Sequence, residues 1–200
     1  MTCFRHSPKG NFLISMTGNS FSILAVCTGN VCRSPAVERL LASKLGPTVT
    51  VTSAGTHALV GHPISEPMAA LLAGYGIDER PFEARRLSKQ MLKEADLILA
   101  LTRAHRSFVV DVWPPAVRRT FTLREFARLL HQVDAAVLPT SPPAVRLRAV
   151  VPLVAAERGR QRASPDDDDV VDPFRLSKDV YAESFGQIAA AVDVIISDLS

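Results

Sequence analysis

The stretch from Ile23 to Pro35, Ile-Leu-Ala-Val-Cys-Thr-Gly-Asn-Val-Cys-Arg-Ser-Pro, decides the fold of this 200-residue chain. Four apolar residues run into Cys27 and predict a strand that is buried on both faces. Arg33 follows after five intervening residues, and Pro35 is typical of the first turn of a helix. A strand, a tight loop and a helix N-terminus together bind anions, because the loop N–H groups and the helix dipole point to one place.

The residue types of this loop suit phosphoryl transfer through a covalent cysteine intermediate. The thiolate is the nucleophilic form of cysteine, and a helix N-terminus beside a guanidinium favours it. The same N–H groups can hold phosphoryl oxygens, and Arg33 can bind two of them with its planar fork. Ser34 is placed to donate a hydrogen bond to the sulfur of Cys27 and to stabilise it as the leaving group of a second step. Gly29 and Asn30 tolerate the positive φ that such a loop needs.

The segment from Val26 to Pro35 resembles the phosphate loop of the low-molecular-weight protein tyrosine phosphatases. The resemblance extends over residues 21–199 and implies a compact α/β enzyme that hydrolyses phosphotyrosine without a metal or other cofactor. It implies that Cys27 is the nucleophile and that the rest of the loop binds phosphate. The phosphate-binding residues are then Thr28, Gly29, Asn30, Val31, Cys32 and Arg33.

Two later motifs match the family's pattern. Ser53, in Ser-Ala-Gly-Thr, matches a serine that hydrogen-bonds within the loop network beside the asparagine corresponding to Asn30. Asp172, in Asp-Pro-Phe, matches the general acid, and Phe174 matches an aromatic residue that flanks the substrate ring. Chemistry requires such an acid, because a phenolate leaves poorly unless it is protonated. Leu59 stands in a loop where many relatives carry a substrate-stacking aromatic residue, so we expect it to flank the substrate.

Length and pattern predict a single α/β domain, a doubly wound four-stranded parallel sheet flanked by helices with the phosphate loop after the first strand. Thr102 is predicted to cap a short helix that carries His105. Apolar runs and helical spacing predict strands at 23–26, 48–52, 96–101 and 119–122 and helices at 36–45, 68–75, 87–95, 123–130 and 178–199.

Two segments depart from this plan. Residues 1–20 lack periodicity and are expected to form a loose N-terminal extension, so the phosphatase domain spans 21–200. Residues 131–171 contain five prolines and scattered arginines, which predict a long basic surface insertion with one short helix within 145–158. From Arg103 to Arg162 the chain has eleven arginines, no lysine and four acidic residues. This bias indicates a solvated face or, as a sharper alternative, a docking surface for an acidic partner.

Composition limits the partners. The net charge of +3 at pH 7 gives no reason to expect nucleic acid, and no stretch approaches a membrane span. Three cysteines do not form a disulfide framework and suit a reducing compartment, so we expect a cytoplasmic protein. No carboxylate spacing beside His57 or His62 supports a metal site, and we also expect a monomer. The resemblance implies tyrosine-phosphorylated proteins as partners, with a cognate bacterial-type tyrosine kinase as one candidate.

Three other functions stay open. A phosphoarginine phosphatase shares the scaffold, but that branch has a threonine at the position of Val31, whose hydroxyl helps to orient a phosphoguanidinium. An arsenate reductase of this fold resolves its intermediate with a later cysteine pair, and no cysteine follows Cys32. An inactive phosphate-binding module would usually have lost the cysteine, the arginine or the aspartate, and none of the three is missing.

Plainer interpretations also stay open for single residues. Cys32 is either a small packing residue or a second thiol that traps oxidised Cys27 as a disulfide, as in relatives with this cysteine pair. Ser53 is alternatively an ordinary turn hydroxyl, and Asp172 an N-cap or turn residue. The aspartates directly before Asp172, at 166–169, are expected to be solvated.

Overall fold

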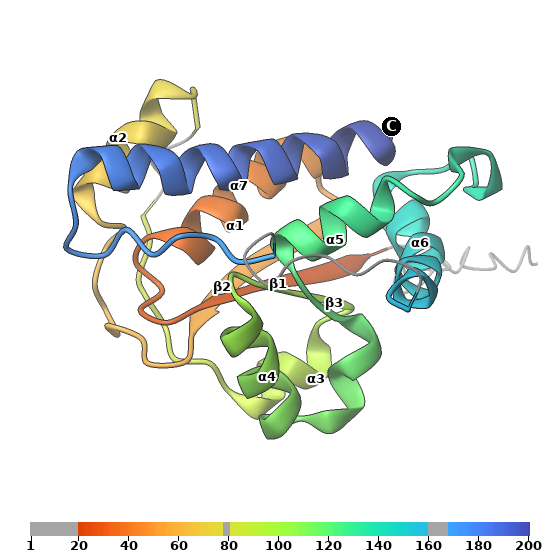
Figure 1. The fold of residues 1–200 in the computed structure, drawn as a ribbon, viewed down its shortest axis with the longest axis horizontal. Helices are drawn as coiled ribbons and strands as arrows, with labels where there is room; N and C mark the ends of the chain where they lie inside the picture. Colours follow the sequence, from red (N-terminus) through yellow and green to blue (C-terminus); the bar gives the residue numbers. More distant parts are fainter. Residues whose placement is uncertain (1–19, 78–80, 160–167) are drawn as a thin grey trace, which may run out of the picture.

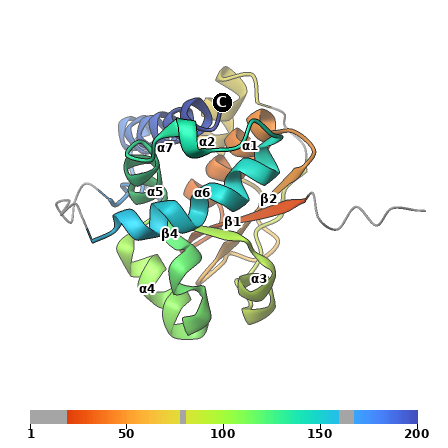
Figure 2. The same ribbon diagram turned by 90° about the vertical axis from the view of Figure 1, so that its right-hand side faces the viewer.

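A parallel sheet of four strands lies between two layers of helices (Figures 1 and 2). The computed structural model describes residues 20–77, 81–159 and 168–200, so the expected N-terminal extension falls almost entirely outside the described residues. The sheet has the strand order β2-β1-β3-β4 and is parallel throughout. Its strands are β1 (Phe21–Cys27), β2 (Val49–Gly55), β3 (Leu97–Ala100) and β4 (Thr120–Thr122).

Helices cover both faces of this sheet, which confirms the doubly wound architecture (Figure 1). Each predicted strand and helix forms within three residues of its expected ends. On one face lie α1 (Arg33–Leu45), α2 (Glu66–Gly74), α5 (Leu123–Leu130) and α7 (Lys178–Asp198). On the other lie α3 (Lys89–Glu94) and α4 (Arg103–Val112). Two 3-10 turns, η2 (Pro114–Arg119) and η3 (Ala135–Val137), follow α4 and α5 in the chain.

The central strand β1 is buried on both faces, as its apolar sequence predicts, and only Ser22 within it is partly exposed. Its side chains alternate between the two cores, because successive residues of a strand point to opposite faces. Ile23, Ala25 and Cys27 face the core under α1 and α7, whereas Leu24 and Val26 face the core above α3 and α4. The register places Cys27 beside Gly55, at the carboxyl ends of β1 and β2.

The proline-rich segment contains a fifteen-residue helix, α6 (Pro143–Glu157), and this corrects the expectation of a surface insertion with one short helix. Apolar residues at helical spacing outweigh the prolines, because Pro143 lies in the first turn and only Pro152 lies inside the helix. The buried face of α6 consists of Ala144, Leu147, Val150, Val151 and Val154. Arg148 donates to the Ser20 carbonyl at 2.7 Å, so α6 packs at the amino end of β1, opposite the phosphate loop (Figure 1).

Many arginines of the basic stretch bond within the protein, so a purely solvated face is the wrong description of it. Arg106 and Arg158 both bind the buried Glu125 carboxylate, each at 3.0 Å, and Arg158 also lies over the Phe121 ring. Burial raises the pKa of Glu125, but the two guanidiniums outweigh it and hold the pKa below its usual range. The other arginines of this stretch that form hydrogen bonds or ion pairs within the protein are Arg103, Arg119, Arg124, Arg128, Arg146 and Arg148.

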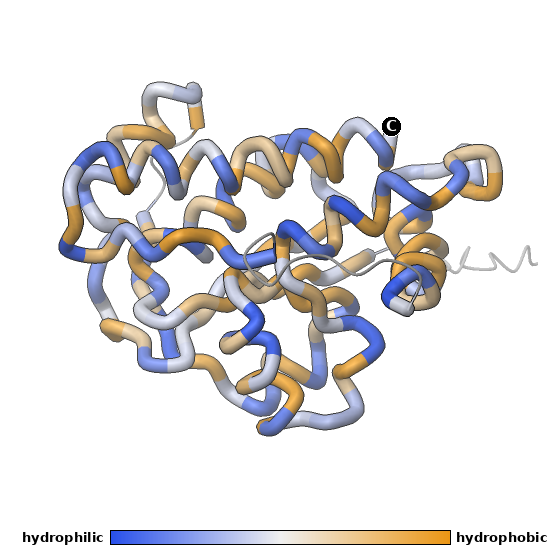
Figure 3. Tube along the Cα trace, in the orientation of Figure 1, coloured by the Kyte–Doolittle hydropathy of each residue, from blue (hydrophilic) through white to orange (hydrophobic). Residues whose placement is uncertain are grey.

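By length and apolar content, α7 is the one helix of the described ranges that could cross a membrane, so the expectation that no segment approaches a span is corrected. Hydrophobic and hydrophilic residues alternate along it (Figure 3), as in an amphipathic helix of a globular domain. Its apolar stripe is buried in the core that it shares with α1 and α5. The buried large residues of this stripe are Tyr181, Phe185, Ile188, Val192 and Ile195.

Candidate active site

The phosphate loop, residues 27–33, links the end of β1 to the start of α1. Asn30 has a φ of 56°, the left-handed conformation expected of it. Gly29 is not among the residues with positive φ, so the expectation for Gly29 is wrong. The loop presses against the end of β2, where a Cβ at Gly55 would clash with the Thr28 carbonyl oxygen. Glycine at this position therefore lets the two backbones approach.

The sulfur of Cys27 lies buried within the loop, near two groups that can donate to it. Its Sγ is 2.9 Å from the Ser34 hydroxyl oxygen and 3.3 Å from the backbone nitrogen of Asn30, which donates to it. The N-terminus of α1 begins within the same loop. These dipoles are placed to stabilise a negative charge on sulfur or on a bound phosphoryl group.

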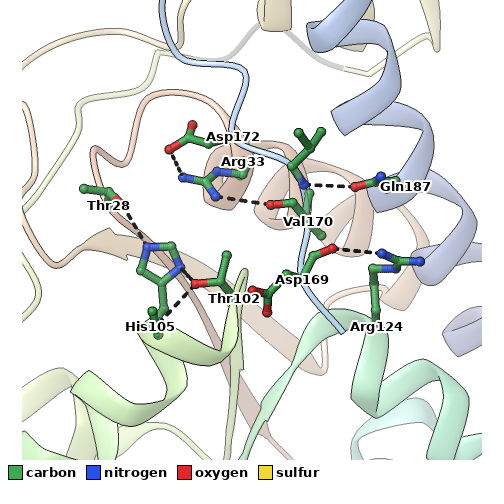
Figure 4. Close-up of a pocket in the computed structure, with 11 residues that line it drawn as sticks. Thr28, Arg33, Thr102, His105, Arg124, Asp169, Val170, Asp172 and Gln187 are labelled. Carbon is green, nitrogen blue, oxygen red and sulfur yellow. Dashed lines mark hydrogen bonds and ion pairs between the residues drawn. The ribbon is translucent and has the colours of Figure 1, made fainter. Parts of the chain in front are cut away.

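Arg33 and Asp172 meet beside the loop (Figure 4). The Arg33 Nη2 lies 2.5 Å from the Asp172 Oδ2, and Nη1 donates to the Val170 carbonyl at 3.3 Å. The Arg33 side chain is 4% exposed, whereas that of Asp172 is 52% exposed. The guanidinium is therefore fixed, and its carboxylate partner can turn towards a ligand in the adjoining cavity.

A hydrogen-bond network behind the loop holds the serine that contacts the cysteine sulfur. Asn30 Nδ2 donates to the Ser34 Oγ at 3.0 Å and to the Ser53 Oγ at 2.8 Å. Ser53 in turn donates to Glu38 Oε2 at 2.6 Å, and the backbone N–H of Arg85 donates to Asn30 Oδ1 at 2.9 Å. Since Ser34 accepts from Asn30, its own hydrogen is free to point at the sulfur. Glu38 and Arg85 are members that sequence spacing alone did not reveal.

A cavity of about 120 Å³ opens above the loop. Besides loop residues it is lined by His57, Leu59, Asp172 and Phe174. Leu59 and Phe174 are 37% and 39% exposed, and both line this cavity, as expected for groups that flank a substrate ring. Among the described residues, no three histidine, cysteine or acidic side chains gather as a metal site.

The segment that carries Asp172 is fastened to the domain by its backbone. The Val170 N–H donates at 2.9 Å to the carbonyl of Leu101, the residue that follows the end of β3. The Val171 N–H donates to Gln187 Oε1, from α7, at 3.0 Å. With the Arg33 bond to the Val170 carbonyl, these contacts fix the position from which Asp172 reaches the cavity.

Asp168 and Asp169 are ion-paired, which corrects the expectation that the aspartates before Asp172 are solvated; 166 and 167 lie outside the described residues. Asp168 binds Arg128 at 3.1 Å, and Asp169 lies 3.6 Å from Arg103. Asp169 also accepts from the Arg103 backbone N–H at the start of α4. These pairs join the acid-bearing segment to α4 and α5.

His105, in the first turn of α4, joins the site from the side opposite the network and was not predicted as a site residue. Its Nε2 lies 2.8 Å from Thr28 Oγ1 and its Nδ1 lies 2.8 Å from Thr102 Oγ1 (Figure 4). Burial and the nearby Arg33 charge lower the pKa of His105 to about 4, so the ring is neutral at pH 7. The ring lines a second cavity of about 590 Å³, which shares Thr28, Arg33 and Asp172 with the phosphate cavity.

Cys32 is buried at the start of α1, and its thiol is directed to α7. Its Sγ lies 3.5 Å from the Tyr181 hydroxyl, which is itself 2.9 Å from the Ser65 hydroxyl. Burial raises the pKa of the Cys32 thiol. Cys32 is therefore a neutral thiol at pH 7, and both it and Cys27 are unpaired cysteines in this structure.

Residues 22–139 of the chain match the family model "Low molecular weight phosphotyrosine protein phosphatase". The chain belongs to this family. It is 43% identical over 113 residues to the low molecular weight protein-tyrosine-phosphatase Etp of Escherichia coli K12, covering 56% of this chain and 74% of Etp. It is 40% identical over 106 residues to a protein-arginine-phosphatase of Geobacillus stearothermophilus, covering 53% of this chain and 71% of that relative.

Solved structures of this phosphatase family share the fold. The YwlE arginine phosphatase from Geobacillus stearothermophilus superimposes with a TM-score of 0.66 at 28% identity, over 90% of this chain and 92% of that one. A low molecular weight protein tyrosine phosphatase from T. tengcongensis gives a TM-score of 0.65 at 28% identity, over 89% and 99%. The family match ends at residue 139, before α6, so this helix lies outside the matched part of the phosphatase.

Proposed function

We propose that this phosphatase hydrolyses phosphotyrosine in proteins through a cysteinyl-phosphate intermediate. One observation carries the proposal: the Cys27 sulfur lies in an anion-binding loop, next to a buried Arg33 that holds the exposed carboxylate of Asp172. Nucleophile, anion-binding guanidinium and acid thus surround one small cavity. Membership of the family supports the same assignment.

In the first step the Cys27 sulfur attacks phosphorus, and the bond between phosphorus and the tyrosyl oxygen breaks. Arg33 and the loop N–H groups hold the equatorial phosphoryl oxygens, where negative charge is concentrated in the transition state. Asp172 gives its proton to the leaving oxygen, which departs as a neutral phenol. Leu59 and Phe174 flank the ring at the mouth of the cavity.

In the second step water attacks the phosphorus of the cysteinyl-phosphate, and the sulfur–phosphorus bond breaks. The Asp172 carboxylate takes a proton from the water, so that it ends the cycle protonated and inorganic phosphate is released. Ser34 donates to the departing sulfur, which leaves as a thiolate. Asn30 and Ser53 support this step by orienting Ser34.

The test is turnover of phosphotyrosine, phosphoserine and phosphoarginine peptides of one sequence by the pure protein. The proposal expects the highest kcat/KM on phosphotyrosine, because the cavity between Leu59 and Phe174 can flank an aromatic ring. It also expects the parent to release a burst of the phenol product equal to the enzyme concentration, since the phosphoryl group stays on Cys27 until the second step. A Cys27→Ser variant should show no such burst. Preferential hydrolysis of phosphoserine would reject the proposal.

Phosphoarginine is the second candidate substrate, because a relative named as an arginine phosphatase is 40% identical to this chain. Val31 argues against it here. Val31 lines the phosphate cavity and has the shape of threonine without its hydroxyl, so it offers a phosphoguanidinium no polar atom.

Replacing Val31 with threonine should therefore raise kcat/KM for phosphoarginine relative to phosphotyrosine by about tenfold, the effect of one added hydrogen bond. Val31→Ile serves as the control, since it changes the shape but adds no polar atom. The ratio of the two kcat/KM values is the measurement. An unchanged ratio in Val31→Thr, or a parent that already prefers phosphoarginine, contradicts this assignment.

We further propose that Cys32 protects Cys27 from irreversible oxidation. Peroxide converts an accessible thiolate to sulfenic acid and then to higher acids that reductants do not reverse. The Cys32 thiol can attack the Cys27 sulfenic acid, forming a disulfide and releasing water. For this reaction Cys32 must leave its contact with Tyr181.

A Cys32→Ser variant should retain much of its activity but recover far less than the parent when peroxide treatment is followed by dithiothreitol. The parent should lose about 2 Da on peroxide treatment, the mass of two hydrogens, and regain it on reduction. Tyr181→Phe is the control, because it removes the hydroxyl partner of Cys32 and leaves both thiols. Equal recovery of the parent and Cys32→Ser would show that Cys32 only packs.

For its cellular setting we propose tyrosine-phosphorylated proteins as partners, including a cognate bacterial-type tyrosine kinase. A cytoplasmic location suits catalysis by a free thiol, which needs reducing conditions. We propose residues 21–200 as the phosphatase domain, since α6 and α7 both contribute to its core. We also propose that this domain acts as a monomer.

A further inference from the structure

We propose that Thr102, His105 and Thr28 form a hydrogen-bond relay that aims the Thr28 hydroxyl at the phosphoryl group of the substrate. The inference rests on the proposed phosphatase function and adds a side-chain donor to the backbone N–H groups of the loop. Thr28 is the group that touches the substrate, and His105 is a positioning residue that acts through it.

The geometry of the relay is tight on both sides of the imidazole. His105 is 8% exposed, and each ring nitrogen lies 2.8 Å from a threonine hydroxyl oxygen. Thr102 caps α4 and accepts from the His105 backbone N–H at 3.2 Å. Thr28 directly follows Cys27, and it lines both the phosphate cavity and the cavity beside it.

Counting protons leaves two tautomers of His105, and the phosphate site favours one of them. A neutral imidazole has one donor and one acceptor nitrogen, and His105 is neutral because its pKa is lowered to about 4. The Thr102 oxygen accepts the His105 backbone N–H, and we assign its hydrogen to Nδ1 because the opposite tautomer suits the phosphate site poorly. Nε2 then carries the ring proton and donates to the oxygen of Thr28. The hydrogen of the Thr28 hydroxyl is left for a phosphoryl oxygen.

The opposite tautomer would suit the site poorly. If Nε2 accepted from Thr28, the hydroxyl would present lone pairs to a phosphate dianion that every other group of the loop is arranged to attract. Thr28 is exposed, so without a partner its hydroxyl would sample several rotamers. The histidine therefore fixes both the position of the Thr28 oxygen and the direction of its hydrogen.

The tautomer can be observed directly. Nitrogen NMR of the parent protein bound to vanadate, a mimic of the phosphoryl transition state, should show His105 with a protonated Nε2 and an unprotonated Nδ1 at pH 7. The reverse assignment, or a doubly protonated ring, overturns the relay. This measurement requires no turnover, so it tests the relay even if the proposed function fails.

Two substitutions of His105 separate positioning from packing. Glutamine places its amide near the position of Nε2 and can still donate to Thr28, whereas asparagine reaches only the position of Nδ1. We expect His105→Gln to stay within about threefold of the parent in kcat/KM, and His105→Asn to lose about tenfold or more. Equal losses in the two variants, at equal melting temperatures, would show that His105 only packs.

Removing the donor itself should have the largest effect in this series. Thr28→Val should lower kcat/KM for nitrophenyl phosphate by about 10–100-fold, the value of a hydrogen bond to a charged group. The double variant Thr28→Val/His105→Asn should lose no more than Thr28→Val alone, because the histidine acts through the threonine. Thr52→Val, on β2 and away from the cavity, is the matched control and should match the parent.

Additive losses in the double variant would overturn the relay. A parent that hydrolyses nitrophenyl phosphate while Thr28→Val is equally active rejects the relay and leaves the phosphatase function standing. A parent that hydrolyses no phosphomonoester rejects the function, and the nitrogen spectrum then decides the relay alone.

Discussion

Asp172→Asn should lower kcat/KM, which reports the first step alone, by about 10²–10⁴-fold for a phosphotyrosine peptide and leave kcat/KM for nitrophenyl phosphate nearly unchanged. A tyrosyl oxygen leaves poorly unless it is protonated, whereas a nitrophenolate is stable enough to leave without a proton. The substitution is close to isosteric, and the asparagine keeps an oxygen where Asp172 Oδ1 accepts the Phe174 N–H at 3.2 Å. The difference between the two substrates therefore reports the proton, not the shape of the site.

Asp179→Asn is the matched control, because Asp179 is an exposed aspartate in the first turn of α7, outside the cavity lining. Both substrates should be turned over by Asp179→Asn as by the parent. Equal losses on both substrates in Asp172→Asn would remove Asp172 from the role of acid. Asp169 would then need the same test, although its contacts with Arg103 already occupy it.

The phosphate loop could be predicted from sequence because its geometry is local. A buried strand ends at Cys27, Asn30 adopts the positive φ that few residue types tolerate, and α1 starts at Arg33. All of these features lie within one short stretch, where backbone preferences decide the conformation. Ser34 reaches the cysteine sulfur for the same reason, since it directly follows the loop in the first turn of α1.

The groups that the sequence did not reveal reach the loop from other elements. The Glu38 carboxylate accepts from Ser53, the Arg85 backbone N–H donates to Asn30, and the His105 ring bonds to Thr28. These contacts depend on how distant segments, α1 and α4 among them, pack on the sheet. Ser53 and Asp172 were identified only through resemblance to a family, because an isolated serine or Asp-Pro carries little information.

The errors at α6 and Gly29 have a common cause. Prolines and glycines were interpreted as signals for loops and for positive φ, yet both residues are also compatible with ordinary backbone. Pro143 and Pro152 fit into α6 because its apolar face gains more from burial than the helix loses at one interior proline. Gly29 lies at a position where a Cβ would make only an ordinary contact with Val31.

Arg33→Lys should lower kcat/KM by about 10²–10³-fold on every substrate, activated or not, which is the cost of losing one donor to the transition state. Lysine supplies a single point charge, whereas the guanidinium of Arg33 binds Asp172 and the Val170 carbonyl with two different nitrogens. A lysine therefore cannot hold the phosphoryl oxygens and the acid-bearing segment together. Uniform loss across substrates distinguishes this effect from that of Asp172→Asn, which depends on the leaving group.

Arg39→Lys is the matched control on the same helix, because Arg39 is also buried and donates to the Pro81 carbonyl at 3.1 Å. It should keep kcat/KM within about twofold of the parent while lowering the melting temperature, as substitutions remote from a site usually do. If Arg33→Lys lost activity only in proportion to a similar loss of stability, its role would be structural. If instead Arg33→Lys is as stable as Arg39→Lys and loses activity and vanadate affinity together, the phosphoryl transition state requires the guanidinium of Arg33 and not only its positive charge.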